Sequence, residues 1–415
     1  LEGSRGCFAP SQSSNRQKGI AMPGSDLPFT QAEFDRRLER VRAEMRARDI
    51  DVLFVEDPSN MAWLTGYDGW SFYVHQGVVV FHDDEPIWWG RRQDANGAVR
   101  TVWMADERVV AYPDYFVQSS ACHLMETLAA LLVQNGYGEA RVGVEMENYY
   151  FTAKAFAVLQ TEMPEAHFVD ATALVNWQRA VKSDEELVFM RRAARISEKI
   201  IDGVWNRIRP GMRKTDLVAD IYADAIRGTD DAWGDYPAIV PLLPSGSDAA
   251  APHLTWDGRL IEKETATFFE IAGCYRRYHV PFCRTIFLGK PPQYLLDAEK
   301  ALVEGLEAGL DAARAGNVAA DVARALGEPL ERAGIDRAAR CGYPIGISYP
   351  PDWGERTISL RIEDDTVLEP GMTFHFMPGL WMDTWGLEIT ESIVIRESGP
   401  AETLCKRPRE LYVKD

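Results

Sequence analysis

A glutamate within an apolar, strand-like stretch is the residue around which a chemical site could form. The stretch covers residues 267–287, reads TFFEIAGCYRRYHVPFCRTIF, and carries Glu270 among aromatic and aliphatic neighbours. A carboxylate is seldom buried without a partner, because removing its charge from water is costly. Glu270 is therefore expected to be paired, to bind a ligand or to face a cavity, unless it points outward from a surface strand.

Two β-strands joined by a turn are predicted for this stretch. β-branched and aromatic residues favour strands, and the second β-prone run closes at residues 285–287. Gly273 is expected to allow the chain to bend between the two runs. We therefore expect Glu270 to lie on the first strand of a hairpin.

The stretch resembles the metal-binding β-hairpin of the creatinase/aminopeptidase-P superfamily, which has the pita-bread fold and the pattern Asp-x-Gly-x(8)-Asp-x-x-Arg. Counted back from Arg284, Glu270 takes the place of the first aspartate and Pro281 takes the place of the second. The histidine of the superfamily's GHGxG-like turn falls on Tyr343, and the glutamate before a proline falls on Met377. Three of the five ligand positions thus hold residues of another kind.

The fifth ligand of the superfamily is a glutamate in a terminal strand, which Glu391 matches. A gapless alignment of that strand instead places Thr390 at the ligand position. At best, two carboxylates remain from the five ligands, and proline and methionine offer neither the oxygen nor the imidazole donors that a hard divalent ion needs. The site is therefore expected to hold no metal and to use no cofactor.

The chain is expected to fold as an α/β (α+β) protein, with an amino-terminal creatinase-like α/β domain over residues 22–178. Residues 1–21 show no apolar h-region and no periodicity, and are interpreted as a vector-derived or disordered tail. Thr30 and Glu33 predict a capping box at the start of a helix, and residues 60–67 resemble the superfamily's N-x-x-Y-L-T-G segment. Strands are predicted at 52–55, 77–81 and 86–89, and a helix around 122–135.

A pita-bread catalytic domain is expected over residues 179–415. Residues 179–187 resemble the R-x-x-K-S-x-x-E junction that begins this domain, and Ser183 with Glu186 predicts a capping box. Residues 368–372 match the superfamily's L-x-P-G-M turn. The resemblance covers nearly all of residues 30–400, with further helices predicted around 187–208, 215–228, 295–315 and 319–333.

A histidine before the hairpin is the next candidate for chemistry. His253 ends the segment PSGSDAAAPH, residues 244–253. Taken alone, a histidine in a loop of small residues is usually a surface residue. The segment resembles the superfamily's S-G-x-N-x-x-x-P-H motif, which implies that His253 faces the substrate as a proton carrier.

Aromatic residues in predicted loops are candidates for substrate binding, with packing in the core as the alternative. Indole faces bind delocalised cations well. The resemblance implies a homodimer in which the loop of residues 68–75 reaches the active site of the other subunit. The residues expected to contact substrate are Trp70, Phe72, Trp233, Trp353 and Trp385, together with Tyr343 and Met377 at the former ligand positions.

Composition limits the possible partners and location. The chain has 415 residues and a net charge of −18. Its length favours two domains, and its acidity argues against nucleic acid or an anionic membrane as a partner. No apolar run is long enough to span a bilayer. The six cysteines are scattered without a C-x-x-C pair, which favours a reduced, cytoplasmic protein with a small-molecule substrate.

Within the superfamily, the pattern is similar to that of ectoine hydrolases, a metal-independent branch that opens the cyclic amidine of ectoine to N-acetyl-2,4-diaminobutyrate. The resemblance rests on Glu270, on Tyr343 in the histidine position and on the tryptophan-rich loops. It implies that Glu270 attacks the ring carbon or activates the water that does so, and that His253 passes a proton to the departing nitrogen. Glu391 would orient Glu270, and the two carboxylates would raise each other's pKa until the substrate cation binds.

The substrate carboxylate needs a cationic or N–H partner. Arg91 and Arg356 are candidates, whereas Arg284 is expected to stabilise the hairpin.

Three other functions remain open at this point. A metal-dependent Xaa-Pro peptidase would need the missing ligands. A creatinase-like amidinohydrolase would act on another guanidine or amidine. A catalytically inactive, peptidase-like binding protein would bind a protein partner and turn over no small amidine.

Overall fold

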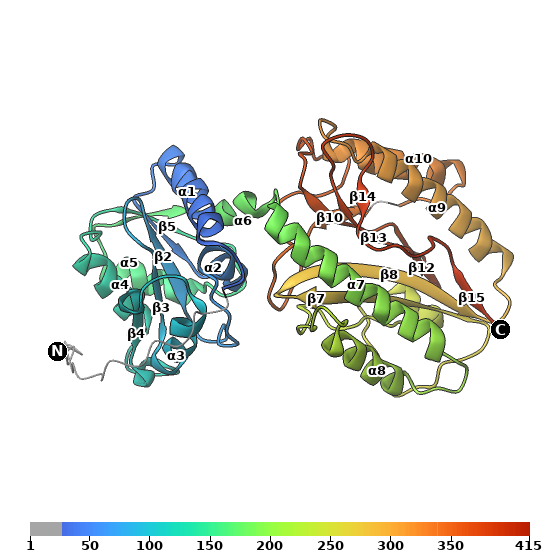
Figure 1. Cartoon of the computed structure of the whole chain (residues 1–415), viewed down its shortest axis with the longest axis horizontal. Helices are drawn as coiled ribbons and strands as arrows, with labels where there is room; N and C mark the ends of the chain where they lie inside the picture. The colour runs from blue at the N-terminus through green and yellow to red at the C-terminus, as the bar shows by residue number, and fades with distance from the viewer. Residues whose placement is uncertain (1–26, 338) are drawn as a thin grey trace.

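The computed structural model describes residues 27–337 and 339–415, so the predicted tail of residues 1–21 lies outside the described residues. Two domains lie side by side and are joined through helix α6 (Leu174–Arg179) (Figure 1). The predicted fold class, an amino-terminal α/β domain followed by a second domain of helices and sheets, is confirmed.

The amino-terminal domain is a six-stranded mixed sheet with helices on both faces. Its strand order is β4-β3-β2-β1-β5-β6, with β1, β5 and β6 parallel. Alternate residues of β1 point to opposite faces, so Leu53 packs with the core under α1 and Phe54 packs with the core under α4. The elements are β1 (Val52–Val55), β2 (Gly77–Phe81), β3 (Ile87–Arg91), β4 (Val109–Tyr112), β5 (Arg141–Val144), β6 (His167–Asp170), α1 (Gln31–Ala47), α2 (Pro58–Thr65), α3 (Arg92–Thr101), α4 (Met125–Gln134) and α5 (Ala153–Glu162).

Helix α1 begins where predicted, but its capping differs in part. The Thr30 side chain accepts a hydrogen bond from the Glu33 N–H, as a capping box requires. The Thr30 N–H, however, donates to Glu185 of the second domain at 3.2 Å, while Glu33 binds two arginines of its own helix. Helix α2 was not predicted, although Asp57 caps it and Pro58 begins it.

A long antiparallel hairpin forms the centre of the second domain. Strands β7 (Thr265–Tyr275) and β8 (Tyr278–Leu288) pair along their full length, and β15 (Tyr412–Lys414) adds to β8 in parallel. The predicted bend at Gly273 is wrong. The turn is formed by Arg276 and Arg277, with φ of 47° and 65°. Gly273 lies within β7, where glycine is needed for close packing against α7 (Asp184–Arg207): a Cβ at this position would lie 2.2 Å from the Ala193 carbonyl oxygen.

Helices cover the outer face of the hairpin, and smaller sheets cover its inner face. In Figure 1, α7 runs across β7 and β8. The Ser183–Glu186 capping box that begins α7 is confirmed. The inner face meets a four-stranded sheet of order β14-β13-β10-β9. The elements are α7 (Asp184–Arg207), α8 (Lys214–Arg227), α9 (Gln293–Ala312), α10 (Ala319–Arg332), β9 (Gly342–Pro344), β10 (Thr373–Phe376), β11 (Gly379–Trp381), β12 (Gly386–Glu388), β13 (Glu391–Val394) and β14 (Glu402–Thr403), with 3₁₀ helices at η1 (Asp106–Arg108), η2 (Asp114–Phe116) and η3 (Gly246–Ala250).

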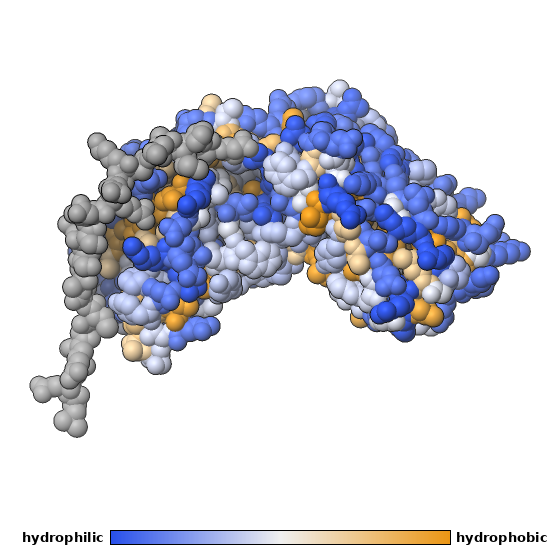
Figure 2. All heavy atoms as spheres, turned by 60° about the horizontal axis from the view of Figure 1, so that its bottom comes forward, coloured by the Kyte–Doolittle hydropathy of each residue, from blue (hydrophilic) through white to orange (hydrophobic). Residues whose placement is uncertain are grey.

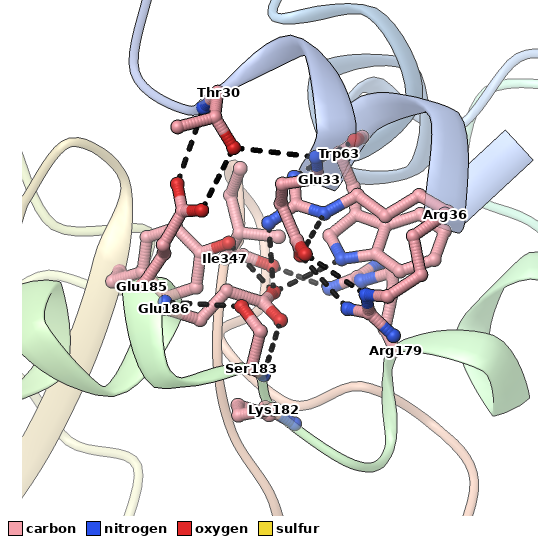
Figure 3. Close-up of polar contacts among 12 residues, drawn as sticks. Thr30, Glu33, Arg36, Trp63, Arg179, Lys182, Ser183, Glu185, Glu186 and Ile347 are labelled. Carbon is pink, nitrogen blue, oxygen red and sulfur yellow. Dashed lines mark hydrogen bonds and ion pairs between the residues drawn. The ribbon is translucent and has the colours of Figure 1, made fainter.

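Buried polar contacts fix the two domains to each other (Figure 3). The Trp63 indole of α2 donates to the Glu186 carboxylate of α7 at 3.0 Å. The Arg179 guanidinium at the end of α6 donates to the Asn60 side-chain oxygen of α2 at 2.7 Å and to the Ile347 carbonyl of the second domain. Because Ile347 lies in the segment that follows β9, these contacts also fix the position of β9.

The surface is largely polar. Hydrophilic residues dominate the face shown in Figure 2, which is hollowed where the two domains meet. None of the described helices is both long and apolar enough to cross a bilayer.

Candidate active site

Glu270 lies buried on the inner face of the hairpin. It pairs across the hairpin with Cys283, and its side chain is only 5% exposed. Burial raises the pKa of Glu270 from 4.5 to about 7, since a low-dielectric environment disfavours the charged carboxylate. Near neutral pH this carboxyl can therefore lose or accept a proton at little cost.

Five residues, which we call the Tyr343 network, form connected hydrogen bonds beside Glu270. The Trp353 indole N–H donates to the Tyr343 hydroxyl at 2.8 Å. The same hydroxyl lies 3.0 Å from His375 Nδ1, and His375 Nε2 lies 2.8 Å from the Thr390 hydroxyl. The Cys283 N–H donates to that hydroxyl at 2.9 Å. The network thus connects the hairpin to the facing sheet.

Strand register explains why these residues meet. In the sheet of β9, β10 and β13, Tyr343 pairs with His375, and His375 pairs with Ser392. Side chains alternate along a strand, so Thr390 and Ser392 face the same side as His375 while Glu391 faces the other side. The sheet therefore presents the His375 imidazole to Glu270 on the same face as the Thr390 and Ser392 hydroxyls.

His375 is neutral in this environment. Burial, and next the charge of Arg340, lower the pKa of His375 to about 3. Its Nδ1 atom lies 4.0 Å from Glu270 Oε1. Because the imidazole is uncharged, this contact is a polar contact and not an ion pair.

Glu388 supplies a second buried carboxylate. It is fully buried at the end of β12, and among the described residues neither of its carboxylate oxygens has a hydrogen-bond partner. Burial, and next the charge of Glu270, hold the pKa of Glu388 well above its ordinary value. The charge of Arg337 opposes this shift but is the smallest of the contributions. Glu388 therefore keeps its proton when Glu270 ionises.

Glu391, predicted to orient Glu270, is placed elsewhere. Its carboxylate lies 2.5 Å from Arg284 Nη2, on the opposite side of β13 from Thr390, and both side chains are fully buried. Arg284 also donates to the Thr390 carbonyl at 2.7 Å. The structure thus supports the gapless alignment, in which Thr390 faces the site, and it supports the expected role of Arg284 in stabilising the hairpin.

Several other predicted residues do not contact Glu270. His253 is exposed in the turn after η3 and forms no hydrogen bond or ion pair with the described residues. Trp233 is 52% exposed and packs on Tyr275 near the hairpin turn. Trp385 packs against Tyr294 of α9. Of the predicted residues, the structure brings Glu270, Tyr343 and Trp353 together.

The amino-terminal aromatic residues form their own surface cluster. Trp70 is 57% exposed and packs on Phe72 and Tyr236 with ring centroids 4.9 Å and 4.6 Å away. Phe72 packs in turn on Tyr150 and Tyr349. Within one chain, Trp70 and Phe72 therefore line no part of the site.

The superfamily implies a divalent metal, and the residues present do not fit one. Pro281 offers no donor, Met377 offers only a thioether, and the Tyr343 oxygen already contacts Trp353 and His375. Among the described residues, no group of three or more histidine, cysteine, aspartate or glutamate side chains is arranged to hold a metal ion. Glu270 and Thr390, the remaining two positions, supply one carboxylate and one hydroxyl, which is too few donors for a hard cation.

Sequence reasoning missed His375 and Glu388. A signal was available for both, since His375 lies two residues before Met377 and Glu388 two residues before Thr390. In a strand, a spacing of two places side chains on the same face. Taken together, the site holds two buried carboxyls beside a neutral imidazole and a phenol, and the charge of the carboxyls suits a cation.

Comparison with known proteins places the chain in a family. Residues 37–181 match the creatinase/prolidase N-terminal domain, and residues 188–397 match metallopeptidase family M24. The ectoine hydrolase of Halomonas elongata is 57% identical over 395 residues, which cover 94% of this chain and 99% of that protein. The uncharacterized hydrolase/peptidase y4tM of Sinorhizobium fredii is 42% identical over 391 residues, covering 94% and 99%.

Solved structures share the fold at low identity. The Xaa-Pro dipeptidase from Bacillus anthracis has a TM-score of 0.77 at 19% identity and covers 92% of this chain and 99% of its own. The N-terminal domain of the FACT complex subunit SPT16 from chickpea has a TM-score of 0.72 at 13% identity, with the same coverage of 92% and 99%. These likenesses concern the fold alone. The chain belongs to metallopeptidase family M24 and carries the amino-terminal domain of the creatinases and prolidases.

Proposed function

We propose that this chain is an ectoine hydrolase, which opens the cyclic amidine of ectoine to N-acetyl-2,4-diaminobutyrate without a metal ion. The observation that carries the proposal is its 57% identity to the Halomonas elongata ectoine hydrolase over nearly the whole of both chains. The site supports it, because the buried acids suit a cationic substrate.

Charge balance at the site fits this substrate. With Glu388 protonated and Glu270 ionised, the two carboxyls together carry one negative charge. An amidinium carries one positive charge and offers N–H donors to both carboxyls. Binding of the cation would lower the pKa of Glu270 and keep it ionised.

The reaction needs an electron pair at the amidinium carbon, which comes either from Glu270 or from a water molecule that Glu270 deprotonates. The Glu270 carboxylate either attacks this carbon or takes a proton from the water that attacks. In both routes the oxygen of water ends in the acetyl group, one ring C–N bond breaks, and the departing nitrogen gains a proton. His253 remains the predicted donor of that proton, and it would have to move toward the substrate to deliver it.

The activity and its independence of metal are tested together. Protein dialysed against a chelator is expected to convert ectoine at an unchanged rate, with a single acetylated product visible by NMR, and added Mn²⁺ or Co²⁺ should not accelerate it. The reason is that the former ligand positions lack donors. Loss of turnover on chelation, restored by metal, would contradict metal independence. Turnover of creatine in place of ectoine would favour a creatinase-like amidinohydrolase.

Arg340 is our candidate for the substrate carboxylate. Its guanidinium carbon lies 4.7 Å from the centroid of the Tyr343 ring. Its side chain is exposed, its guanidinium forms no hydrogen bond or ion pair with the described residues, and its charge is close enough to lower the pKa of His375. Ectoine would then lie with its amidinium toward the carboxyls and its carboxylate toward Arg340.

Arg340→Ala is expected to raise the KM for ectoine roughly 10-fold or more with little change in kcat, since a charge-assisted contact away from the reacting carbon is lost. Steady-state kinetics would measure this. Arg356→Ala is the matched control. Arg356 is also exposed and its guanidinium carbon lies 4.6 Å from the centroid of the Tyr149 ring, but it contacts none of the described residues around Glu270. Equal effects of the two substitutions would count against Arg340.

The exposed aromatic residues and the free cysteines indicate how the protein assembles and where it works. The exposed Trp70 and Tyr73, at 57% and 70%, support a homodimer, because monomers rarely expose clustered aromatic residues. Five described cysteines are free thiols, which supports a reducing, cytoplasmic location.

A further inference from the structure

His375 is neutral, but its charge does not determine which tautomer is present, because a neutral imidazole can carry its proton on either nitrogen. Each choice assigns different donors and acceptors to the Tyr343 network. The network is buried and its partners are known, so the two choices can be compared bond by bond.

With the proton on Nε2, the Thr390 hydroxyl oxygen accepts two hydrogen bonds, from His375 and from the Cys283 N–H. The Tyr343 hydroxyl then donates to Nδ1. The Thr390 proton is left without an acceptor among the described residues, and Thr390 is fully buried. A buried, unsatisfied polar group is unfavourable.

With the proton on Nδ1, the Thr390 hydroxyl donates to Nε2 while accepting from Cys283. The Tyr343 oxygen accepts from both His375 and Trp353. Its two acceptor positions are then filled, so its own proton must point elsewhere. Tyr343 is 8% exposed whereas Thr390 is fully buried, so a bound ligand can accept the Tyr343 proton but not the Thr390 proton.

Glu270 provides a second and independent reason to choose this tautomer. Its Oε1 atom lies 4.0 Å from His375 Nδ1. A protonated Nδ1 at this distance is attracted by the carboxylate while it donates to Tyr343, whereas a nitrogen lone pair in that place is repelled.

We propose that His375 is a positioning residue, held with its proton on Nδ1. Its N–H occupies the second acceptor position of the Tyr343 oxygen, so the Tyr343 hydroxyl becomes a hydrogen-bond donor directed into the site. The inference rests on the proposed function only for what the hydroxyl contacts. There it would donate a hydrogen bond to a ring nitrogen, which gains a lone pair as Glu270 or water adds to the amidinium carbon. A donor fixed before the reaction begins avoids reorganisation in the transition state.

The tautomer itself can be measured without substrate. The chain has seven histidines, so ¹⁵N-histidine labelling gives few signals, and His375→Asn identifies the one from His375. We expect a protonated Nδ1 and an unprotonated Nε2. A protonated Nε2 would overturn the inference whatever the activity of the protein, whereas lack of ectoine turnover with the expected tautomer would overturn only the proposed function.

A double-mutant cycle tests the consequence for turnover. Tyr343→Phe and His375→Ala are each expected to lower kcat about 10²-fold with a smaller effect on KM, as for loss of one transition-state donor. The double variant should be little worse than either single variant, because both remove the same directed proton. His375→Asn, which keeps an N–H near the position of Nδ1, should retain more activity than His375→Ala. Losses that simply multiply, or no advantage of asparagine over alanine, would contradict the assignment.

Discussion

Glu270→Gln is expected to lower kcat/KM for ectoine at least about 10³-fold, the size of loss seen when an attacking group or base is removed. Glutamine keeps the shape of the side chain but has no charge to pair with the amidinium and no basic oxygen. The backbone pairing with Cys283 is unaffected by this change. Single-turnover measurements with excess enzyme would show whether the loss lies in the chemical step. Activity within tenfold of the unmodified protein would exclude Glu270 as the attacking group or base.

The same substitution should stabilise the fold above neutral pH. The pKa of Glu270 rises from 4.5 to about 7 on folding because of burial, so between these values the folded state binds more protons than the unfolded state. The free energy of unfolding therefore falls as pH rises through this range. At pH 8 the variant should be more stable by up to about 3 kcal/mol, at ~1.4 kcal/mol per pKa unit, and at pH 4 the difference should vanish. Urea unfolding at both pH values would measure this, and a constant difference would point to a change in packing instead.

Much of the fold could be predicted because local signals agreed with the final contacts. Ser183 with Glu186 and the apolar stripe that follows predict α7 without knowledge of its neighbours. Helix α2 could also have been found from Asp57, Pro58 and the left-handed Gly66 at its end. The hairpin turn could not, because two arginines adopt left-handed φ there while Gly273 is required for close packing against α7.

The site was predictable only where motif spacing assigned a residue to it. Glu270 and Tyr343 occupy former ligand positions, so a resemblance to the superfamily identifies both. Glu388 and His375 carry no motif, and their roles depend on which face of a strand turns inward. For the terminal strand, a one-residue choice between Thr390 and Glu391 reverses that face.

Fold alone does not decide between an enzyme and a binding protein. A dipeptidase and a FACT complex subunit both match this chain with TM-scores above 0.7. What favours an enzyme is the local chemistry, because the buried pair of Glu270 and Glu388 is costly to the fold. A protein that used only its surface would gain nothing from keeping two acids in its core.

Glu388→Leu is expected to raise the KM for ectoine and to lower kcat/KM about 10²-fold, because leucine has no oxygen to accept the hydrogen bond from the amidinium, which is worth about 1.5–3 kcal/mol. The fold should be no less stable, since neither Glu388 oxygen has a partner to lose among the described residues. Isothermal calorimetry with ectoine would separate binding from turnover.

Glu391→Gln is the matched control, because Glu391 lies three residues away and is equally buried. It pairs with Arg284 at 2.5 Å, and leaving that buried arginine without its charged partner should cost about 3 kcal/mol of stability. Its folded fraction should nevertheless bind ectoine with unchanged affinity. If Glu391→Gln weakened ectoine binding and Glu388→Leu did not, the second carboxylate of the site would be Glu391, and the inward face of the terminal strand would have to be reassigned.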